Sequence, residues 1–225
     1  MRAPRGVTLA TLAIMGADTT GLDNTRSIVV GRLLDERRPE EALAALAMLP
    51  KKHTAALRLE LRARQRIGQW DQVPALIDQL EKRGVFNAGR ADAERRHAWR
   101  QLIEHRSGDV AGLAETWKRV PDRYRRTTIV AGAAAAAFHA LGQHVEAQAV
   151  IERSLDVEWD GGLVNLYGEC GGATDALRQI ERAERWLKNH REDSTLLLAL
   201  GRLCARQQLW GKAQSYLESS IQHGA

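Results

Sequence analysis

The chain has 225 residues, of which 44% are apolar and 5% aromatic, and its 33 Lys and Arg against 28 Asp and Glu give a formal charge of +5. This apolar content excludes an intrinsically disordered chain. Two cysteines are too few for a small disulfide-stabilised scaffold. Because the composition favours helix-forming residues and strand-like alternation is missing, the sequence predicts an all-α fold.

The first 25 residues differ in pattern from the rest of the chain. Their longest apolar run, VTLATLAIM at 7–15, is much too short to span a bilayer. The GAD that follows Met15 makes a poor signal-peptide cleavage site. We therefore predict an irregular or non-native lead-in at 1–25, followed by one helical repeat domain at 26–225.

In the repeat domain, a small apolar residue recurs near the start of successive amphipathic helices, each time after a turn-forming stretch. The steps between these anchor residues are 31, 38, 36, 36 and 30 residues, close to the roughly 34-residue period of tetratricopeptide (TPR) repeats. A small side chain lets two antiparallel helices approach closely, so we expect the anchor residues to pack the helices together. They are Ala42, Val73, Ala111, Ala147, Ala183 and Ala213.

The last copy, LLLALGRLCARQQLWGKAQSYLESS at 196–220, shows the whole hairpin pattern. Leu197, Leu200 and Cys204 form one apolar stripe, and Gly201 lets a neighbouring helix come near. The weakest copy is 162–190, where a glycine-rich stretch shortens the first helix. Together the copies predict a right-handed α-α superhelix of about six TPR-like hairpins.

Two tryptophans occupy equivalent places in the repeat. Trp70 and Trp210 each lie three residues before an anchor residue, between the two helices of a hairpin. A tryptophan at such a place has a large apolar area to bury against the next helix pair. We therefore predict that both side chains pack one repeat against another.

The sequence lacks the patterns that mark catalytic and metal sites. It contains no nucleophile elbow, phosphate loop or His-Glu-x-x-His run, so we predict no enzyme activity. His139 and His144 are five residues apart across the turn at Gly142, which does not match the i, i+4 spacing of a helical metal pair. We predict no metal site, and we expect Cys170 and Cys204 to be buried free thiols.

Arginines recur on the predicted first helices of the hairpins, at positions that coincide when the copies are aligned by their anchor residues. The first helices of stacked hairpins line the inner surface of a superhelix. One interpretation is a groove that binds carboxylates or phosphates, and the alternative is a row of solvated charges on the outer face. The residues are Arg58, Arg62, Arg96, Arg100, Arg202 and Arg206.

Three stretches resemble HemY-family proteins, the protoheme IX biogenesis proteins of proteobacteria. They are RRHAWRQLI at 95–103, GLVNLYG at 162–168, and ERAERWLKNH at 181–190 with the hairpin that follows it. The resemblance implies TPR-like repeats and a part in a late step of haem synthesis. Family members begin with two membrane-spanning helices, so we expect a full-length relative to be anchored in the bacterial inner membrane with this domain on the cytoplasmic side. We expect membrane contact only through such helices.

Two classes of function follow. The first is a non-catalytic interaction or scaffold domain for a protein partner, for which the resemblance implies enzymes of haem synthesis. The alternative is a small-molecule module whose arginines hold the propionates of haem or a porphyrin, the one cofactor that the resemblance suggests. Nucleic-acid binding is not expected because the basic residues form no clustered run. Self-association through an uncapped end of the repeat array is a further expectation.

Overall fold

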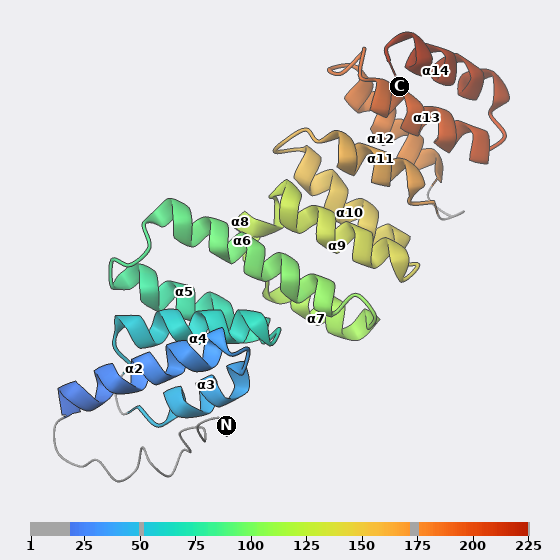
Figure 1. Cartoon of the computed structure of the whole chain (residues 1–225). Coiled ribbons are helices and arrows are strands. Elements are labelled where there is room, and N and C mark those ends of the chain that lie inside the picture. The colour runs from blue at the N-terminus through green and yellow to red at the C-terminus, as the bar shows by residue number, and fades with distance from the viewer. Residues whose placement is uncertain (1–18, 50–51, 172–175, 225) are drawn as a thin grey trace, which may run out of the picture. The chain divides into compact units, whose positions relative to one another are not determined.

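The computed structural model describes residues 19–49, 52–171 and 176–224, and within them it contains helices and no strand (Figure 1). This confirms the predicted all-α class. The first helix begins at Thr19, so residues 19–25 are helical and do not belong to an irregular lead-in as predicted; residues 1–18 lie outside the described part. The helices are α2 (Thr19–Asp35), α3 (Pro39–Ala47), α4 (Thr54–Arg66), η1 (Trp70–Gln72, a 3-10 turn), α5 (Val73–Lys82), α6 (Ala88–His105), α7 (Val110–Arg119), α8 (Asp122–Arg125), α9 (Thr128–Ala140), α10 (His144–Leu155), α11 (Gly161–Glu169), α12 (Ala176–Leu187), α13 (Ser194–Arg206) and α14 (Trp210–Gln222).

The chain divides into two compact units, an N-terminal unit at residues 1–98 and a C-terminal unit at residues 99–225. In the N-terminal unit, α4 packs on α2, α3 and α5. In the C-terminal unit, the α9–α10 pair packs on α11, α11 packs on α13, and α13 pairs with α14 (Figure 1). Among the described helices, none combines the length and the apolar character needed to cross a membrane.

Within the described residues, four pairs of helices are joined by the same short turn, and the same pattern also ends α5 at Gly84, before a longer connection. A residue with positive φ closes the first helix of each pair: Arg37, Gly68, Gly142 and Gln208. Its N–H donates to the carbonyl three residues earlier, and the next N–H donates to the carbonyl five residues before it. This is the Schellman pattern, which satisfies the last carbonyls of a helix and reverses the chain. The pairs are α2–α3, α4–α5, α9–α10 and α13–α14.

The anchor residue follows this turn at a constant distance. Ala42, Val73, Ala147 and Ala213 each lie five residues after the positive-φ residue, and each is at most 3% exposed. The turn therefore fixes where the buried small residue falls in the second helix, which is why the sequence period marks the hairpins. Ala183, in α12, is also fully buried.

The α6–α7 hairpin departs from this rule, and the prediction for Ala111 is wrong. Ala111 is exposed. The helix α7 begins only at Val110, and its N-cap Asp109 accepts a hydrogen bond from the Ala111 N–H. Ala111 therefore lies in the first turn of α7, before the residue that packs on the neighbouring helix. Leu113, the fourth residue of α7, is fully buried. It takes the place that Ala42 takes as the fourth residue of α3. The longer connection before α7 displaces the register by two residues.

The two equivalent tryptophans have different surroundings. Trp70 packs against the core of the N-terminal unit, and its ring meets His97 of α6 edge-on at a centroid distance of 5.4 Å. Trp210 is 66% exposed, which contradicts the predicted packing role. In the part of the chain that the structure describes, no ring lies against Trp210 as His97 does against Trp70.

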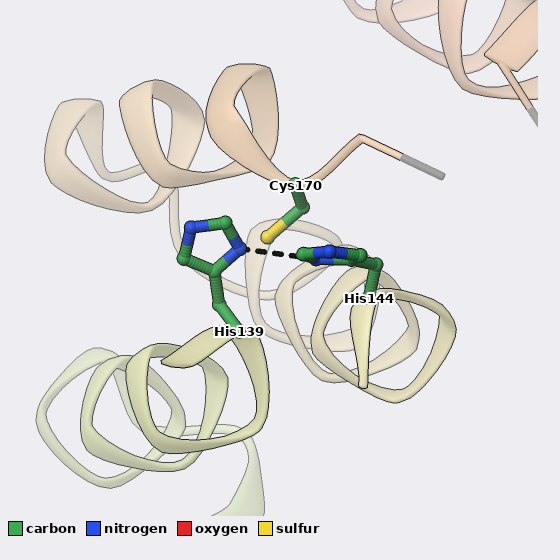
Figure 2. A group of neighbouring side chains, drawn as sticks. All are labelled: His139, His144 and Cys170. Atoms are coloured by element: carbon green, nitrogen blue, oxygen red, sulfur yellow. Dashed lines mark hydrogen bonds between the residues drawn. The ribbon is translucent and has the colours of Figure 1, made fainter. Parts of the chain in front are cut away.

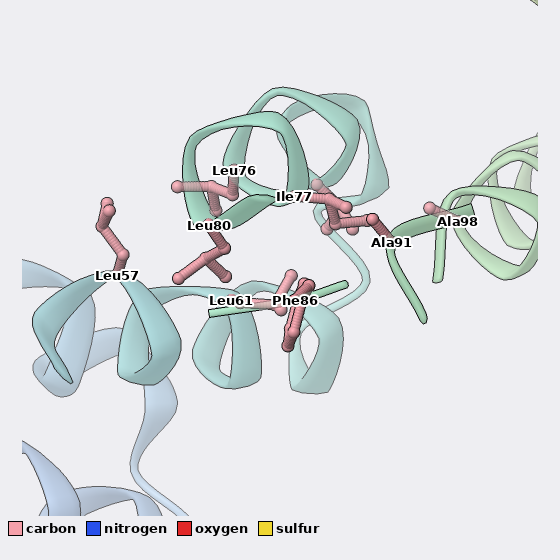
Figure 3. Close-up of a cluster of buried hydrophobic side chains, with 9 residues drawn as sticks. Leu57, Leu61, Leu76, Ile77, Leu80, Phe86, Ala91 and Ala98 are labelled. Atoms are coloured by element: carbon pink, nitrogen blue, oxygen red, sulfur yellow. The ribbon is translucent and has the colours of Figure 1, made fainter. Parts of the chain in front are cut away.

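One hydrophobic cluster of the N-terminal unit lies between α4 and α5 (Figure 3), and another lies between α2, α3 and α4. Leu57 and Leu61, one turn apart on α4, face Ile77 and Leu80 of α5, and Phe86 joins them from the chain that follows α5. Each fully buried leucine or isoleucine contributes roughly 1.5 to 3 kcal/mol relative to an exposed one. A second apolar face of α4, with Ala56 and Ala63, packs on α2 and α3, so the exposed polar side chains of α4 lie between these two buried faces.

We expect Gly68→Ala to lower the free energy of unfolding by about 1 kcal/mol, because a side chain is strained in the left-handed conformation, here a φ of 72°. Gly31→Ala is the matched control, since this glycine lies inside α2 and no atom comes within 4 Å of the added Cβ. We expect the control to be neutral or to gain up to about 1 kcal/mol of helix propensity. Urea denaturation followed by circular dichroism measures both changes. Equal effects at the two glycines would contradict the turn geometry.

Candidate binding sites

The arginine pair Arg58 and Arg62 lies on the exposed face of α4, one helical turn apart. The neighbouring residues Leu57 and Leu61 belong to the buried stripe, and the arginines, about 100° further round the helix, point away from it into solvent. Within the described residues, no hydrogen bond or ion pair engages either guanidinium. Two such groups in one line can each bind a carboxylate or phosphate through paired N–H donors.

Arg96 and Arg100 are engaged by carboxylates of their own helix. Arg96 donates to Asp92 at 2.6 Å, and Arg100 donates to Glu104 at 2.7 Å, both in the i, i+4 relation. Pairs of this type neutralise the local charge, although each adds little to stability when exposed. The alignment makes Arg96 and Arg100 equivalent to Arg58 and Arg62. The two pairs differ, however, in that carboxylates of the described chain bind only Arg96 and Arg100 among these four.

Arg202 and Arg206 extend from α13 to α11 in the C-terminal unit. Arg202 donates to the side-chain oxygen of Asn165 at 2.9 Å, and Arg206 donates to the main-chain carbonyl of Glu169 at 3.1 Å. The Glu169 carboxylate lies 3.7 Å from Arg202. Both arginines thus connect the first helix of the last hairpin to the preceding first helix, a positioning role that the sequence analysis did not assign to them.

The second helices of the same region are connected by Glu184 of α12. Its carboxylate accepts hydrogen bonds from Lys212 at 2.9 Å and from Tyr216 at 3.0 Å, both on α14. The hydrogen bond from Lys212 lowers the pKa of Glu184 below its ordinary value. First helices therefore bond to first helices and second helices to second helices between α11–α12 and α13–α14.

A charged pocket of about 380 Å³ opens between α4 and α5 of the N-terminal unit. Glu60, only 3% exposed, accepts hydrogen bonds there from Lys52 at 2.8 Å and from Arg64 at 2.7 Å. Burial by itself raises the pKa of Glu60, but the hydrogen bonds and charges of Lys52 and Arg64 outweigh it, so the net pKa is lowered. Glu60 therefore binds both cations of the pocket. The lining residues are Lys52, Leu57, Glu60, Arg64, Asp71, Gln72, Ala75, Leu76 and Gln79.

Three potential metal ligands meet in the C-terminal unit (Figure 2). His139 lies in the last turn of α9 and His144 is the first residue of α10, so the turn at Gly142 places the two imidazoles side by side. Their Nδ1 atoms are 3.1 Å apart. The thiol of Cys170, at the end of α11, joins them, and all three ligand atoms lie within 4.8 Å of one another.

Spacings along a single helix do not reveal this group of three ligands. A hairpin turn brings residues five apart into contact, and Cys170 comes from the next helix pair, so no local motif joins the three. His139 and His144 do not form an i, i+4 pair on one helix, but the turn still brings their Nδ1 atoms to 3.1 Å. Cys170 and Cys204 are both buried free thiols, as predicted.

Comparisons with known proteins do not assign a function to this chain. No protein-family model matches the chain, and no curated protein matches it.

Proposed function

We propose that this chain is a non-catalytic binding module of TPR-like hairpins that docks an acidic segment of a protein partner on the Arg58–Arg62 face of α4. The observation that carries this proposal is the pair of exposed guanidinium groups, one turn apart, with no carboxylate of the described chain engaging them. Of the six arginines in the predicted row, the other four hydrogen-bond within their own unit. An acidic partner would supply the missing counter-charges.

The repeated hairpin geometry supports a scaffold. Four Schellman turns with a buried residue at one fixed spacing indicate that the same helical hairpin is used several times. The bonds from α13 to α11 and from α14 to α12 join like helices of neighbouring hairpins, the connectivity from which a right-handed TPR-like superhelix is built. Such arrays typically bind extended segments along their first helices.

The resemblance to HemY-family proteins supports the choice of partner. It suggests that the acidic segment belongs to an enzyme of late haem synthesis, and that a full-length relative works at the bacterial inner membrane with this domain on the cytoplasmic side. Under this proposal the chain assembles or positions such enzymes and carries out no chemical step itself.

The test compares two double variants of the whole chain in a pull-down and a binding titration with the haem-synthesis enzymes of the same bacterium. Arg58→Gln/Arg62→Gln removes the exposed pair, and Arg96→Gln/Arg100→Gln is the matched control on arginines that already hold carboxylates. Losing two charge contacts of up to about 1 kcal/mol each should weaken binding on the order of tenfold, and added salt should weaken wild-type binding.

Wild-type affinity in the Arg58/Arg62 variant, or a greater loss in the control variant, would refute the docking face. A porphyrin titration separates the alternative function. If the arginines held propionates instead, haem would bind the wild-type chain with a shift of its Soret band, and the Arg58/Arg62 variant would lose that shift.

A further inference from the structure

We propose that His139, His144 and Cys170 form a binding site for a zinc-type divalent metal ion, with three protein ligands and a fourth position open to water. Two imidazoles and one thiolate are a ligand set that zinc accepts in proteins, and sites with three protein ligands keep a position for an exchangeable molecule. This inference is independent of the arginine face, which lies in the other unit.

The distances fit a shared ion. Two nitrogens bound to one tetrahedral zinc at about 2.0 to 2.1 Å each lie roughly 3.3 Å apart, and the two Nδ1 atoms here are separated by 3.1 Å. The sulfur lies no more than 4.8 Å from either nitrogen. Figure 2 shows the Cys170 sulfur directed at the space between the two imidazoles. A movement of about 1 Å by the thiol side chain completes the bonding distances of a zinc ion.

The supporting residues hold Cys170 by its main chain and leave its thiol directed at the histidines. The buried amides of Gln148 and Gln179 both donate to the Cys170 carbonyl, at 3.0 Å and 2.7 Å, and the Cys170 N–H donates to Leu166. Gln148 lies on α10, one turn after His144. One helix thus presents an imidazole to the sulfur and an amide to the carbonyl of the same cysteine, the kind of second layer that orients metal ligands.

The chemistry of the three groups selects the metal. Imidazole and thiolate favour zinc and similar transition metals, whereas Mg²⁺ and Ca²⁺ require oxygen ligands. Among the described residues, no carboxylate belongs to the group of three. Magnesium and calcium are therefore expected not to compete.

Metal binding at this site must release a proton. A thiol must lose its proton to become a metal ligand, so when the ion binds, the Cys170 proton leaves to solvent. The proton that one histidine shares between the two Nδ1 atoms moves to the Nε2 atom of its own ring. The affinity is therefore expected to rise with pH.

The experiment titrates the whole chain, free of any histidine tag, with Co²⁺ as a spectroscopic substitute for zinc. We expect one ion per chain, the visible absorption of tetrahedral cobalt and a near-ultraviolet thiolate-to-cobalt band, all lost when Zn²⁺ is added and unaffected by excess Mg²⁺. Cys170→Ser should abolish the thiolate band, and His139→Gln should weaken binding at least tenfold. Cys204→Ser is the matched control, because Cys204 is also a buried free thiol but lies outside the group.

Circular dichroism of each variant confirms that it is folded, and the half-buried His144→Gln variant provides a second substitution that leaves the buried thiol in place. No thiolate band in the wild-type chain would overturn the proposal and leave the three residues as a packing cluster. A band that persists in Cys170→Ser and disappears in Cys204→Ser would overturn it equally.

Discussion

Replacement of Gly168 by alanine is expected to lower the free energy of unfolding of the C-terminal unit by about 2 kcal/mol, the range for an overpacked core site. Gly168 is buried where α11 packs on α13. A Cβ at this position would lie 2.8 Å from the Cβ and 2.9 Å from the Cα of Ala199. Because the second of these atoms is main chain, the clash cannot be relieved by a side-chain rotation, and the two helices must separate.

Gly132→Ala is the control for this substitution. Gly132 also lies inside a helix of the C-terminal unit, but its added Cβ would rest 3.7 Å from the side chain of Leu163, an ordinary contact. We expect the control to be neutral or to gain up to about 1 kcal/mol from helix propensity. Urea denaturation followed by circular dichroism gives both values, and a stabilising Gly168→Ala would rule out the close approach of α11 and α13.

The second large effect is expected at Glu60, whose replacement by alanine should cost about 2 kcal/mol at neutral pH. The substitution leaves the partly exposed Lys52 and Arg64 without the carboxylate that both of them bind, and a hydrogen bond to a charged group contributes about 1.5 to 3 kcal/mol. The control is Glu41→Gln, because the Arg38–Glu41 pair is exposed. We expect no resolvable change in the urea midpoint for the control.

The same carboxylate makes stability depend on pH. The net pKa of Glu60 is lower in the folded chain than its ordinary value of 4.5. A group of this kind stabilises the fold fully above its unfolded pKa, and that contribution is lost as the pH falls through the folded pKa. The wild-type chain should therefore lose stability below about pH 4.5 more steeply than Glu60→Gln. Parallel curves of urea midpoint against pH for the two proteins would show that Glu60 does not titrate in this way.

The helical class and most of the hairpin packing could be predicted from the sequence because both depend on local rules. A small residue recurs near the TPR period, and it locates the second helix of a hairpin wherever the preceding turn has the same length. The turns before Ala42 and Ala147 have this length. The sequence also predicts that a neighbouring helix comes near at Gly201. In the structure, a Cβ there would lie 2.6 Å from Leu217 of α14.

The rest could not be predicted because it depends on loop length or on contacts between hairpins. A longer connection shifted the register at Ala111, so a count of residues pointed to an exposed position. The metal-ligand group needs Cys170 to arrive from α11 against the turn at Gly142, and no spacing along the chain encodes that contact. Which arginines of the predicted row are free of neighbouring carboxylates depends on the acidic residues beside each one, and the recurrence of arginine alone does not reveal it.

The central claim is that neighbouring hairpins stack first helix on first helix, and a double-mutant cycle between Gly168 and Ala199 tests it most directly. Ala199→Gly removes one of the two atoms that the new methyl of Gly168→Ala would strike. We expect the double variant to be more stable than the sum of the two single changes by about 1 kcal/mol, the coupling expected of residues in contact. Strict additivity of the two free-energy changes would contradict the packing of α11 on α13.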